Sequence, residues 1–210
     1  MERTLDLVTS TKSPRDSFLM DCKNRLNICM SAFCYHIDDN TPLFVEGYQL
    51  PHYDSICHVD VDLAAINPYW LDKLKSKNLY AYRAELFYYP AGIEHHMPIH
   101  VDNQNGDRAK INWVFGGAGS VMKWYKLLNK TPKEHLTGSA PGSSYKRYDA
   151  NEVELIYTSS VSNPSIVQVG IPHNIYTPGA ERWTYCLVVI DPNTKTNASF
   201  RKIKEIFTEN

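Results

Sequence analysis

Between residues 79 and 190 the chain alternates short apolar runs with turn-forming residues, a pattern typical of a β-rich domain. Each run is rich in aromatic and β-branched residues and ends near Gly, Pro, Asn or Asp, which predicts strands. We expect eight of them, at 79–89, 98–102, 109–115, 120–127, 153–158, 165–170, 173–176 and 182–190. With helical signals outside this series, they predict a mainly β fold with peripheral helices. The expected architecture is a jelly-roll or cupin-like barrel, also called a double-stranded β-helix.

The segments around this series carry other signals. Ser13-Pro14-Arg15-Asp16 has the cap residue and early proline of a helix start, and Asn67-Pro68 begins a second helix that ends near Asn78. Residues 36–66 hold turn signals and short apolar runs, which favour peripheral strands. The polar insert 129–151 is rich in turn-forming residues and is predicted to be a mobile loop.

A length of 210 residues fits one domain spanning 1–210. We expect helical and strand decoration over 1–78, the double-stranded β-helix core over 79–190, and a C-terminal extension over 191–210. Within that extension, Phe200–Phe207 fits either a helix or a strand.

Composition and charge indicate which binding partners and which cellular compartment to expect. With 22 basic and 23 acidic residues, the net charge of −1 predicts no general nucleic-acid surface and no binding to an anionic membrane. Five cysteines form no paired framework and no Cys-x-x-Cys motif. Since there is also no signal peptide and no long apolar segment, we expect a reducing, cytoplasmic setting.

The motif His-x-Asp is the first candidate for chemistry, because residues two apart on a strand point the same way and can bind one metal ion. About one match is expected by chance, but the chain has four: His36/Asp38, His52/Asp54, His58/Asp60 and His100/Asp102. Only the last pair lies within the predicted strand series, so we select it, with His58/Asp60 as the main alternative. A distant second histidine would complete a 2-His-1-carboxylate group, which suits non-haem Fe(II) with open positions.

The stretch Ile171–Ile190 carries a second candidate. In a buried strand Arg182, Thr184 and Cys186 share one face, and no acidic residue lies at the inward positions of that strand. A buried arginine needs an anionic partner, because an unpaired charge in a core is unfavourable. A ligand carboxylate held by Arg182 and the Thr184 hydroxyl would supply one. The alternative is a salt bridge from Arg182 to a distant Asp or Glu.

Two other motifs partly match a zinc-protease site and a phosphate-binding loop, but each lacks a required feature. His96 and His100 have the spacing of a zinc-protease helix, but Pro98 between them disfavours that helix. The glycines at 116, 117 and 119 lack the Lys-Ser/Thr of a phosphate-binding loop, so a hairpin turn is expected there.

Residues Tyr88–Trp124 and Ile171–Val189 together resemble the Fe(II)/2-oxoglutarate-dependent oxygenase superfamily. The matching elements are Tyr89-Pro90-Ala91-Gly92 before His100-Val101-Asp102, then His173, then Arg182-x-Thr184. The run HVDNQNGDRAKINWVF also resembles the aspartyl/asparaginyl β-hydroxylase and prolyl hydroxylase branches. Two features depart from the family pattern: the gap between His173 and Arg182 is slightly shorter than usual, and Thr184 stands where serine is commoner.

The resemblance implies a site and a reaction. It assigns iron binding to His100, Asp102 and His173, the distal carboxylate of 2-oxoglutarate to Arg182 and Thr184, and its metal-proximal end to Lys110 or Asn112. The implied enzyme uses Fe(II), 2-oxoglutarate and O₂, forms succinate and CO₂, and hydroxylates a C–H bond of its substrate. A small molecule, an amino acid or peptide, or a nucleoside would fit as that substrate.

Two alternatives remain. One is a catalytically silent barrel that acts as a binding or structural module, and the other is a cupin-like metalloenzyme that does not use 2-oxoglutarate. Arg182 and Thr184 separate these classes, because only a 2-oxoglutarate enzyme needs both beside the metal. We expect substrate specificity to lie in 129–151 and 36–66, since variable loops on a rigid scaffold carry recognition.

Overall fold

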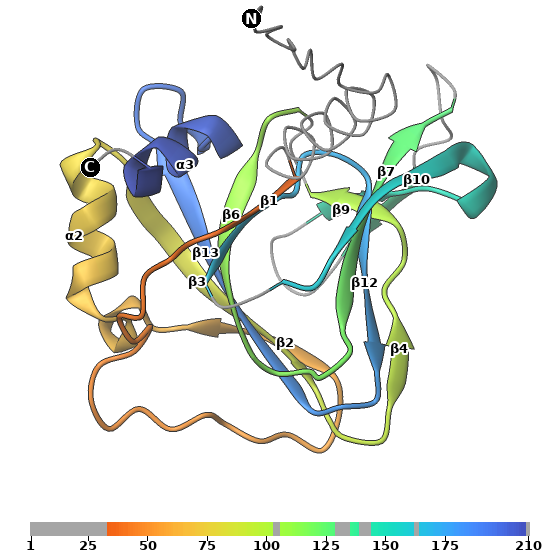
Figure 1. Ribbon diagram of the computed structural model, residues 1–210, viewed down its shortest axis with the longest axis horizontal. Coiled ribbons are helices and arrows are strands. Elements are labelled where there is room, and N and C mark those ends of the chain that lie inside the picture. Colours follow the sequence, from red (N-terminus) through yellow and green to blue (C-terminus); the bar gives the residue numbers. More distant parts are fainter. Residues whose placement is uncertain (1–32, 103–105, 129–134, 139–143, 162–163, 209–210) are drawn as a thin grey trace, which may run out of the picture.

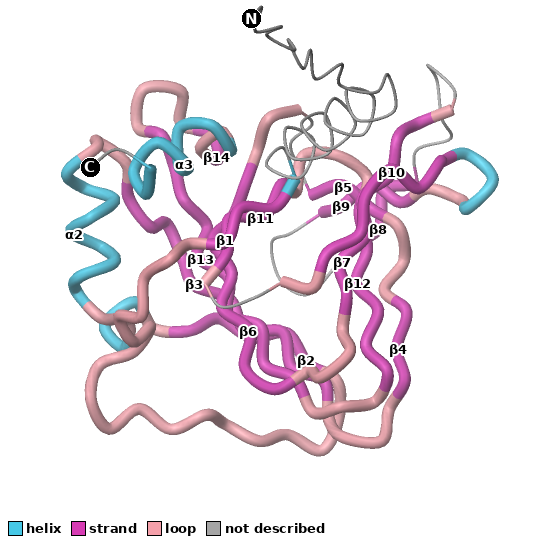
Figure 2. Tube along the Cα trace, viewed as in Figure 1, coloured by secondary structure: helices cyan, strands magenta, loops and turns pink. Residues whose placement is uncertain are grey.

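Two antiparallel sheets make up most of the protein (Figures 1 and 2). The computed structural model describes residues 33–102, 106–128, 135–138, 144–161 and 164–208. The first sheet has the order β1-β11-β6-β13-β3-β2, with β14 paired to β13. Its strands are β1 (Cys34–His36), β2 (Cys57–Val61), β3 (Tyr80–Tyr89), β6 (Ala109–Gly116), β11 (Ser165–Gln168), β13 (Arg182–Asp191) and β14 (Thr196–Asn197).

The second sheet has the order β10-β7-β12-β5-β9-β8, with β4 paired to β12. Its strands are β4 (Glu94–His96), β5 (His100–Asp102), β7 (Val121–Leu127), β8 (His135–Gly138), β9 (Ser144–Arg147), β10 (Val153–Ser159) and β12 (His173–Pro178). It faces one side of the first sheet (Figure 1). Within the described residues, no strand of one sheet pairs with a strand of the other.

Two helices, α2 (Pro68–Ser76) and α3 (Phe200–Thr208), cover the outer face of the first sheet (Figure 1). Asn67 caps α2, because its side chain accepts a hydrogen bond from the Tyr69 backbone N–H at 3.0 Å, and Pro68 takes the first helical position. Trp70 of α2 packs edge-on against Trp113 of β6, with ring centroids 4.9 Å apart. The described part of the chain contains no helix that is long and apolar enough to cross a membrane.

β13 shows how the sheet separates an apolar layer from a polar one. Trp183, Tyr185 and Leu187 point outward into the main hydrophobic core beneath the helices. The alternate residues Arg182 and Thr184 point inward, toward the second sheet, because successive side chains on a strand face opposite sides. The strand is therefore buried on both faces, yet its inner face carries polar groups.

Each of the eight predicted strands is present, as β3, β5, β6, β7, β10, β11, β12 and β13, so a mainly β fold is confirmed. The helix predicted after Asn67 is confirmed as α2, and the ambiguous segment near the C-terminus forms the helix α3. The helix start predicted at Ser13 lies outside the described residues.

One expectation needs correction. The insert 129–151, predicted to be a loop, contains β8, β9 and the short 3-10 helix η2 (Ala150–Glu152). β9 pairs with both β8 and β5, so sheet extension outweighs the local turn signals. The peripheral strands predicted within 36–66 are confirmed in part, because the end of β1 and the strand β2 lie there at the two edges of the first sheet, with the 3-10 helix η1 (Leu63–Ala65) and irregular chain in the rest.

Candidate metal centre

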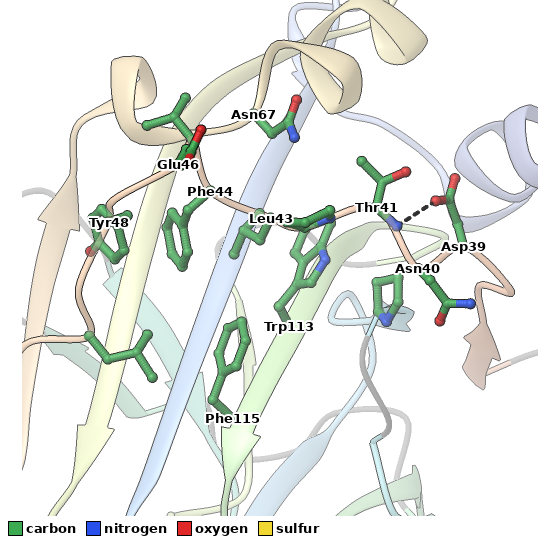
Figure 3. A pocket seen from close by; sticks show the side chains of 14 residues that line it. Asp39, Asn40, Thr41, Leu43, Phe44, Glu46, Tyr48, Asn67, Trp113 and Phe115 are labelled. Carbon is green, nitrogen blue, oxygen red and sulfur yellow. Dashed lines mark hydrogen bonds between the residues drawn. The ribbon is translucent and has the colours of Figure 1, made fainter.

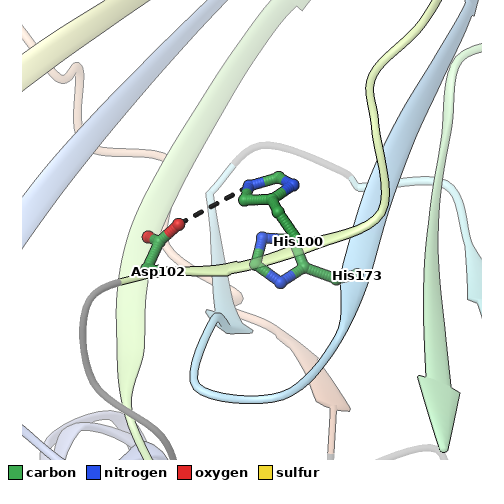
Figure 4. A group of neighbouring side chains, drawn as sticks. All are labelled: His100, Asp102 and His173. Carbon is green, nitrogen blue, oxygen red and sulfur yellow. Dashed lines mark ion pairs between the residues drawn. The ribbon is translucent and has the colours of Figure 1, made fainter. Parts of the chain in front are cut away.

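His100, Asp102 and His173 come together between the sheets (Figure 4). His100 and Asp102 share one face of β5, and His173 lies directly opposite His100 on the neighbouring strand β12. One ligand atom from each of the three residues lies within 4.8 Å of the others. Among the residues that the structure describes, this is the only group of three or more His, Cys, Asp or Glu side chains arranged in this way.

The same kind of hydrogen bond orients both histidine rings. Nδ1 of His100 lies 2.9 Å from the Pro98 carbonyl oxygen, and Nδ1 of His173 lies 2.8 Å from that of Ile171. Because a carbonyl only accepts, each Nδ1 donates a proton to it, so Nε2 is the ring nitrogen left to bind a metal. Burial, reinforced by the nearby His100, lowers the pKa of His173 to about 3, so this ring is neutral near pH 7.

Asp102 supplies the anionic ligand. Its Oδ1 lies 3.6 Å from Nε2 of His100, the contact drawn in Figure 4, and its Oδ2 lies 2.8 Å from Nζ of Lys110. Burial alone would raise the pKa of Asp102, but the Lys110 charge and the contact with His100 outweigh it and hold the pKa well below the ordinary value. The carboxylate is therefore ionised.

Lys110 and Asn112 lie on the inner face of β6, but Lys110 is already paired. Its Nζ lies 3.1 Å from Oε2 of Glu85, a β3 residue that is only 1% exposed. Oε1 of Glu85 pairs with Arg83 and lies 3.6 Å from Nε2 of His58. Asn112 is buried, and its Oδ1 has no hydrogen-bond partner among the described residues.

Arg182 and Thr184 carry buried polar atoms that have no hydrogen-bond partner among the described residues. They are 2% and 1% exposed, and within the described chain Nε and Nη1 of Arg182 and Oγ1 of Thr184 make no hydrogen bond. The guanidinium carbon lies 5.8 Å from the centre of the Tyr89 ring, but the described residues offer Arg182 no ion pair. The salt bridge to a distant acid, the alternative suggested by the sequence, is therefore not formed with any described residue.

Arg182 lines a cavity of about 270 Å³ at the end of β6 and β7. Ser120 lines the same cavity, and its buried hydroxyl also lacks a hydrogen-bond partner in the described structure. Gly117 lies against the Arg182 side chain so closely that a Cβ there would approach Cγ and Cδ of Arg182 to 2.8 Å. The cavity thus presents hydrogen-bond donors and a positive charge, the features that an anion requires.

The competing sites suggested by the sequence are not assembled. His58 stacks on Phe87 with ring centroids 4.2 Å apart, while Asp60 is exposed, so that pair does not converge on a metal. The segment Glu94–His96 is the strand β4 rather than a helix, and His96 is exposed, which excludes the zinc-protease arrangement.

A larger cavity, of about 600 Å³, lies on the opposite face of the first sheet (Figure 3). Phe44 and Tyr48 from the irregular segment before β2 line it together with Trp113 and Phe115 of β6. Because Trp113 alternates with Asn112 along β6, the sheet separates this cavity from the metal group. Within the described chain, none of its lining residues belongs to the His100-Asp102-His173 group, so we place the candidate chemistry at that group, on the inner face of the sheet.

Sequence reasoning did not identify Glu85 or this outer cavity. Glu85 gave one signal, since it is an acidic residue within the predicted apolar strand 79–89 and its neighbours point to the core. The outer cavity gave none, because it depends on how irregular chain packs across Trp113.

Comparison with known proteins leaves the side chains as the guide to function. The sequence matches no model of a known protein family, and no curated protein is significantly similar to it. Two imidazoles and one carboxylate on one side of a metal ion would leave other coordination positions open. Such a donor set can bind a divalent first-row metal.

Proposed function

We propose that this protein is an Fe(II)- and 2-oxoglutarate-dependent dioxygenase with a double-stranded β-helix fold. The observation that carries the proposal is a preformed His-Asp-His group together with a buried guanidinium on β13 that has no anion among the described residues. The first feature provides a metal site with open positions, and the second provides a site for the carboxylate of a co-substrate.

The strand pairing supports the fold assignment. Of the eight core strands, β3 pairs with β13, β5 with β12, β6 with β11, and β7 with β10. The first strand therefore pairs with the last, the second with the seventh, and so on inward. Nested pairing of this kind is what results when one long antiparallel ribbon is rolled into a jelly roll.

The metal donors fit iron. Each Nε2 of His100 and His173 is free to bind because the Nδ1 proton is held by a backbone carbonyl. Asp102 is ionised and presents Oδ1 toward the histidines. A 2-His-1-carboxylate face leaves three of six octahedral positions, enough for a chelating co-substrate and O₂.

The surroundings of Arg182 fit the distal carboxylate of 2-oxoglutarate. Isolating a charged side chain from water is unfavourable by several kcal/mol unless a counter-charge and hydrogen bonds replace its hydration. A carboxylate would pair with the guanidinium and accept a hydrogen bond from the Thr184 hydroxyl, both of which lack partners in the described structure. Asn112, next to Lys110 on the inner face of β6, would face the other end of the co-substrate.

Bound iron would supply the redox chemistry, in which O₂ oxidises 2-oxoglutarate to succinate and CO₂ and the second oxygen atom is inserted into a C–H bond of the substrate. The protein contributes position and environment. His100, Asp102 and His173 hold the metal on one side, Arg182 and Thr184 hold the carboxylate, and the buried interior excludes water. The substrate can be a small molecule, an amino acid or peptide, or a nucleoside.

The test is succinate formation from 2-oxoglutarate, with Fe(II) loaded anaerobically before oxygen is admitted. We expect slow turnover by the wild type without added substrate, and none by His100→Ala, Asp102→Ala or Arg182→Ala. His58→Ala is the matched histidine control and should retain turnover. Loss in His58→Ala with activity surviving in His100→Ala would place the metal elsewhere, and turnover surviving in Arg182→Ala would remove the assigned carboxylate site.

A further inference from the structure

Lys110 occupies a position that the proposed function alone does not explain. Its ammonium lies between two carboxylates, 2.8 Å from Oδ2 of Asp102 and 3.1 Å from Oε2 of Glu85. Only 12% of the lysine side chain is exposed, and Glu85 is almost fully buried. A buried pair of this kind persists when its geometry is good and its remaining hydrogen-bonding groups are satisfied.

The two carboxylate oxygens of Asp102 have different partners. Oδ2 faces the lysine, whereas Oδ1 faces Nε2 of His100 at 3.6 Å. A metal bound by the two histidines would meet Oδ1, and Oδ2 would remain engaged by the ammonium. Asp102 would then be a single-oxygen ligand rather than a chelating one.

Glu85 makes this arrangement electrostatically acceptable. An ammonium beside a metal carboxylate would repel the metal ion, but the nearby charge of Glu85 offsets it. Glu85 is in turn held by Arg83, so the chain Asp102, Lys110, Glu85 and Arg83 alternates in sign. Lys110 reaches Glu85 across β13, where Val188 pairs with Lys110 and Cys186 pairs with Glu85.

We propose that Lys110 is a positioning residue that holds Asp102 as a single-oxygen metal ligand and thereby keeps three coordination positions open, with Glu85 as its anchor. This inference rests on the metal site of the proposed function, but it does not require 2-oxoglutarate or turnover. It assigns Lys110 to the metal carboxylate instead of the co-substrate. Asn112 then remains as the β6 side chain available to the co-substrate.

The number of water molecules on bound Mn(II), measured by water-proton relaxation, tests the proposal without activity. An octahedral ion with three protein donors carries three waters. We expect three in the wild type and two in Lys110→Met, because the released Oδ2 would take one position. Lys110→Met should bind Mn(II) at least as tightly as the wild type, since a repelling cation has been removed.

Glu85→Gln should keep three waters but bind Mn(II) about tenfold more weakly, because Lys110 would lose its counter-charge, and changes around metal ligands have effects of this size. Lys126→Met, an exposed lysine on β7, is the matched control and should behave as the wild type. If Lys110→Met does not fold, the double variant Lys110→Met/Glu85→Gln removes the pair together, and its water count decides in the same way.

Three waters in the folded lysine variant would overturn the proposal, as would equal weakening of Mn(II) binding by Lys110→Met and Glu85→Gln, the result expected of a purely structural ion pair. Failure of the wild type to bind Mn(II) would contradict the metal site itself. The two failures are therefore distinguishable.

Discussion

His100 and His173 face each other across a strand pair, and each ring is held by a hydrogen bond from Nδ1 to the carbonyl oxygen two residues earlier in the chain. Their ring centroids are 4.4 Å apart. This shared contact fixes both rings with Nε2 available and makes the site ready for metal without a change of tautomer. The remaining features of the interior, an ionised Asp102 and an Arg182 with no ion pair among the described residues, then have consequences that can be measured.

Arg182→Met should raise the stability of the ligand-free protein. The change removes a buried charge that has no anionic partner among the described residues, so we expect the free energy of unfolding to increase by about 1–3 kcal/mol. The same variant should lose the stabilisation that 2-oxoglutarate gives the metal-loaded wild type. Urea unfolding with and without 2-oxoglutarate measures both effects, and a marked loss of stability in the ligand-free variant would instead identify Arg182 as a structural arginine.

Gly117→Ala should weaken 2-oxoglutarate binding without affecting the metal. Its Cβ would lie 2.8 Å from Cγ and Cδ of Arg182, so the arginine must shift within a packed interior. A displacement worth about 1.4 kcal/mol corresponds to a tenfold rise in the dissociation constant. Gly47→Ala is the matched control, because Gly47 also has a positive φ but nothing lies within 4 Å of its added Cβ. Calorimetric titration of both variants makes the comparison, and equal affinities would show that Arg182 does not hold the co-substrate.

The hydrogen bonds of Asp39 lead us to expect a separate effect of pH on the stability of the fold. Its carboxylate accepts hydrogen bonds from Tyr69 Oη at 2.5 Å, the Thr41 backbone N–H at 3.0 Å and Lys73 Nζ at 3.2 Å. Burial opposes ionisation, but these contacts outweigh it and lower the pKa of Asp39 to about 2. The stabilisation is fully present above the unfolded value near 4 and is lost as pH falls toward 2, because the unfolded chain binds the proton more readily.

Asp39→Asn should therefore cost about 1–2 kcal/mol of stability at pH 7, allowing for solvent screening, and much less at pH 2.5. Urea unfolding at the two pH values gives the comparison. An equal loss at both would show that the effect comes from packing rather than from the charge of Asp39.

The eight core strands could be predicted from the sequence because each of them carries its own local signal. The run 182–190 is mostly apolar, and the structure confirms a strand buried between helices and the second sheet. The helix after Asn67 could also be predicted from local sequence, since a cap residue and a proline at the first helical position define its start. By contrast, β9 depends on pairing Arg147 with His100, almost fifty residues away, and local turn residues conceal it.

The candidate metal site could be predicted only in part from the sequence, because it too depends on contacts between distant segments. Spacing indicated His100 and Asp102, but the same spacing occurs in three pairs that do not form such a group in the structure. Only the pairing of β5 with β12 brings His173 opposite His100. The partners of Lys110 were out of reach, because Glu85 approaches it across an intervening strand and no sequence spacing relates the two.

Binding of 2-oxoglutarate to the anaerobic, Fe(II)-loaded protein, followed by the visible absorption of the iron chelate, tests the central claim most directly. We expect one equivalent to bind to the wild type and to His58→Ala, and no band with His173→Ala or, at the same concentration, with Arg182→Met. A wild-type protein that binds Fe(II) but not 2-oxoglutarate would contradict the account and favour a cupin-like metalloenzyme. One that binds neither would leave a barrel whose role is binding or structure rather than this chemistry.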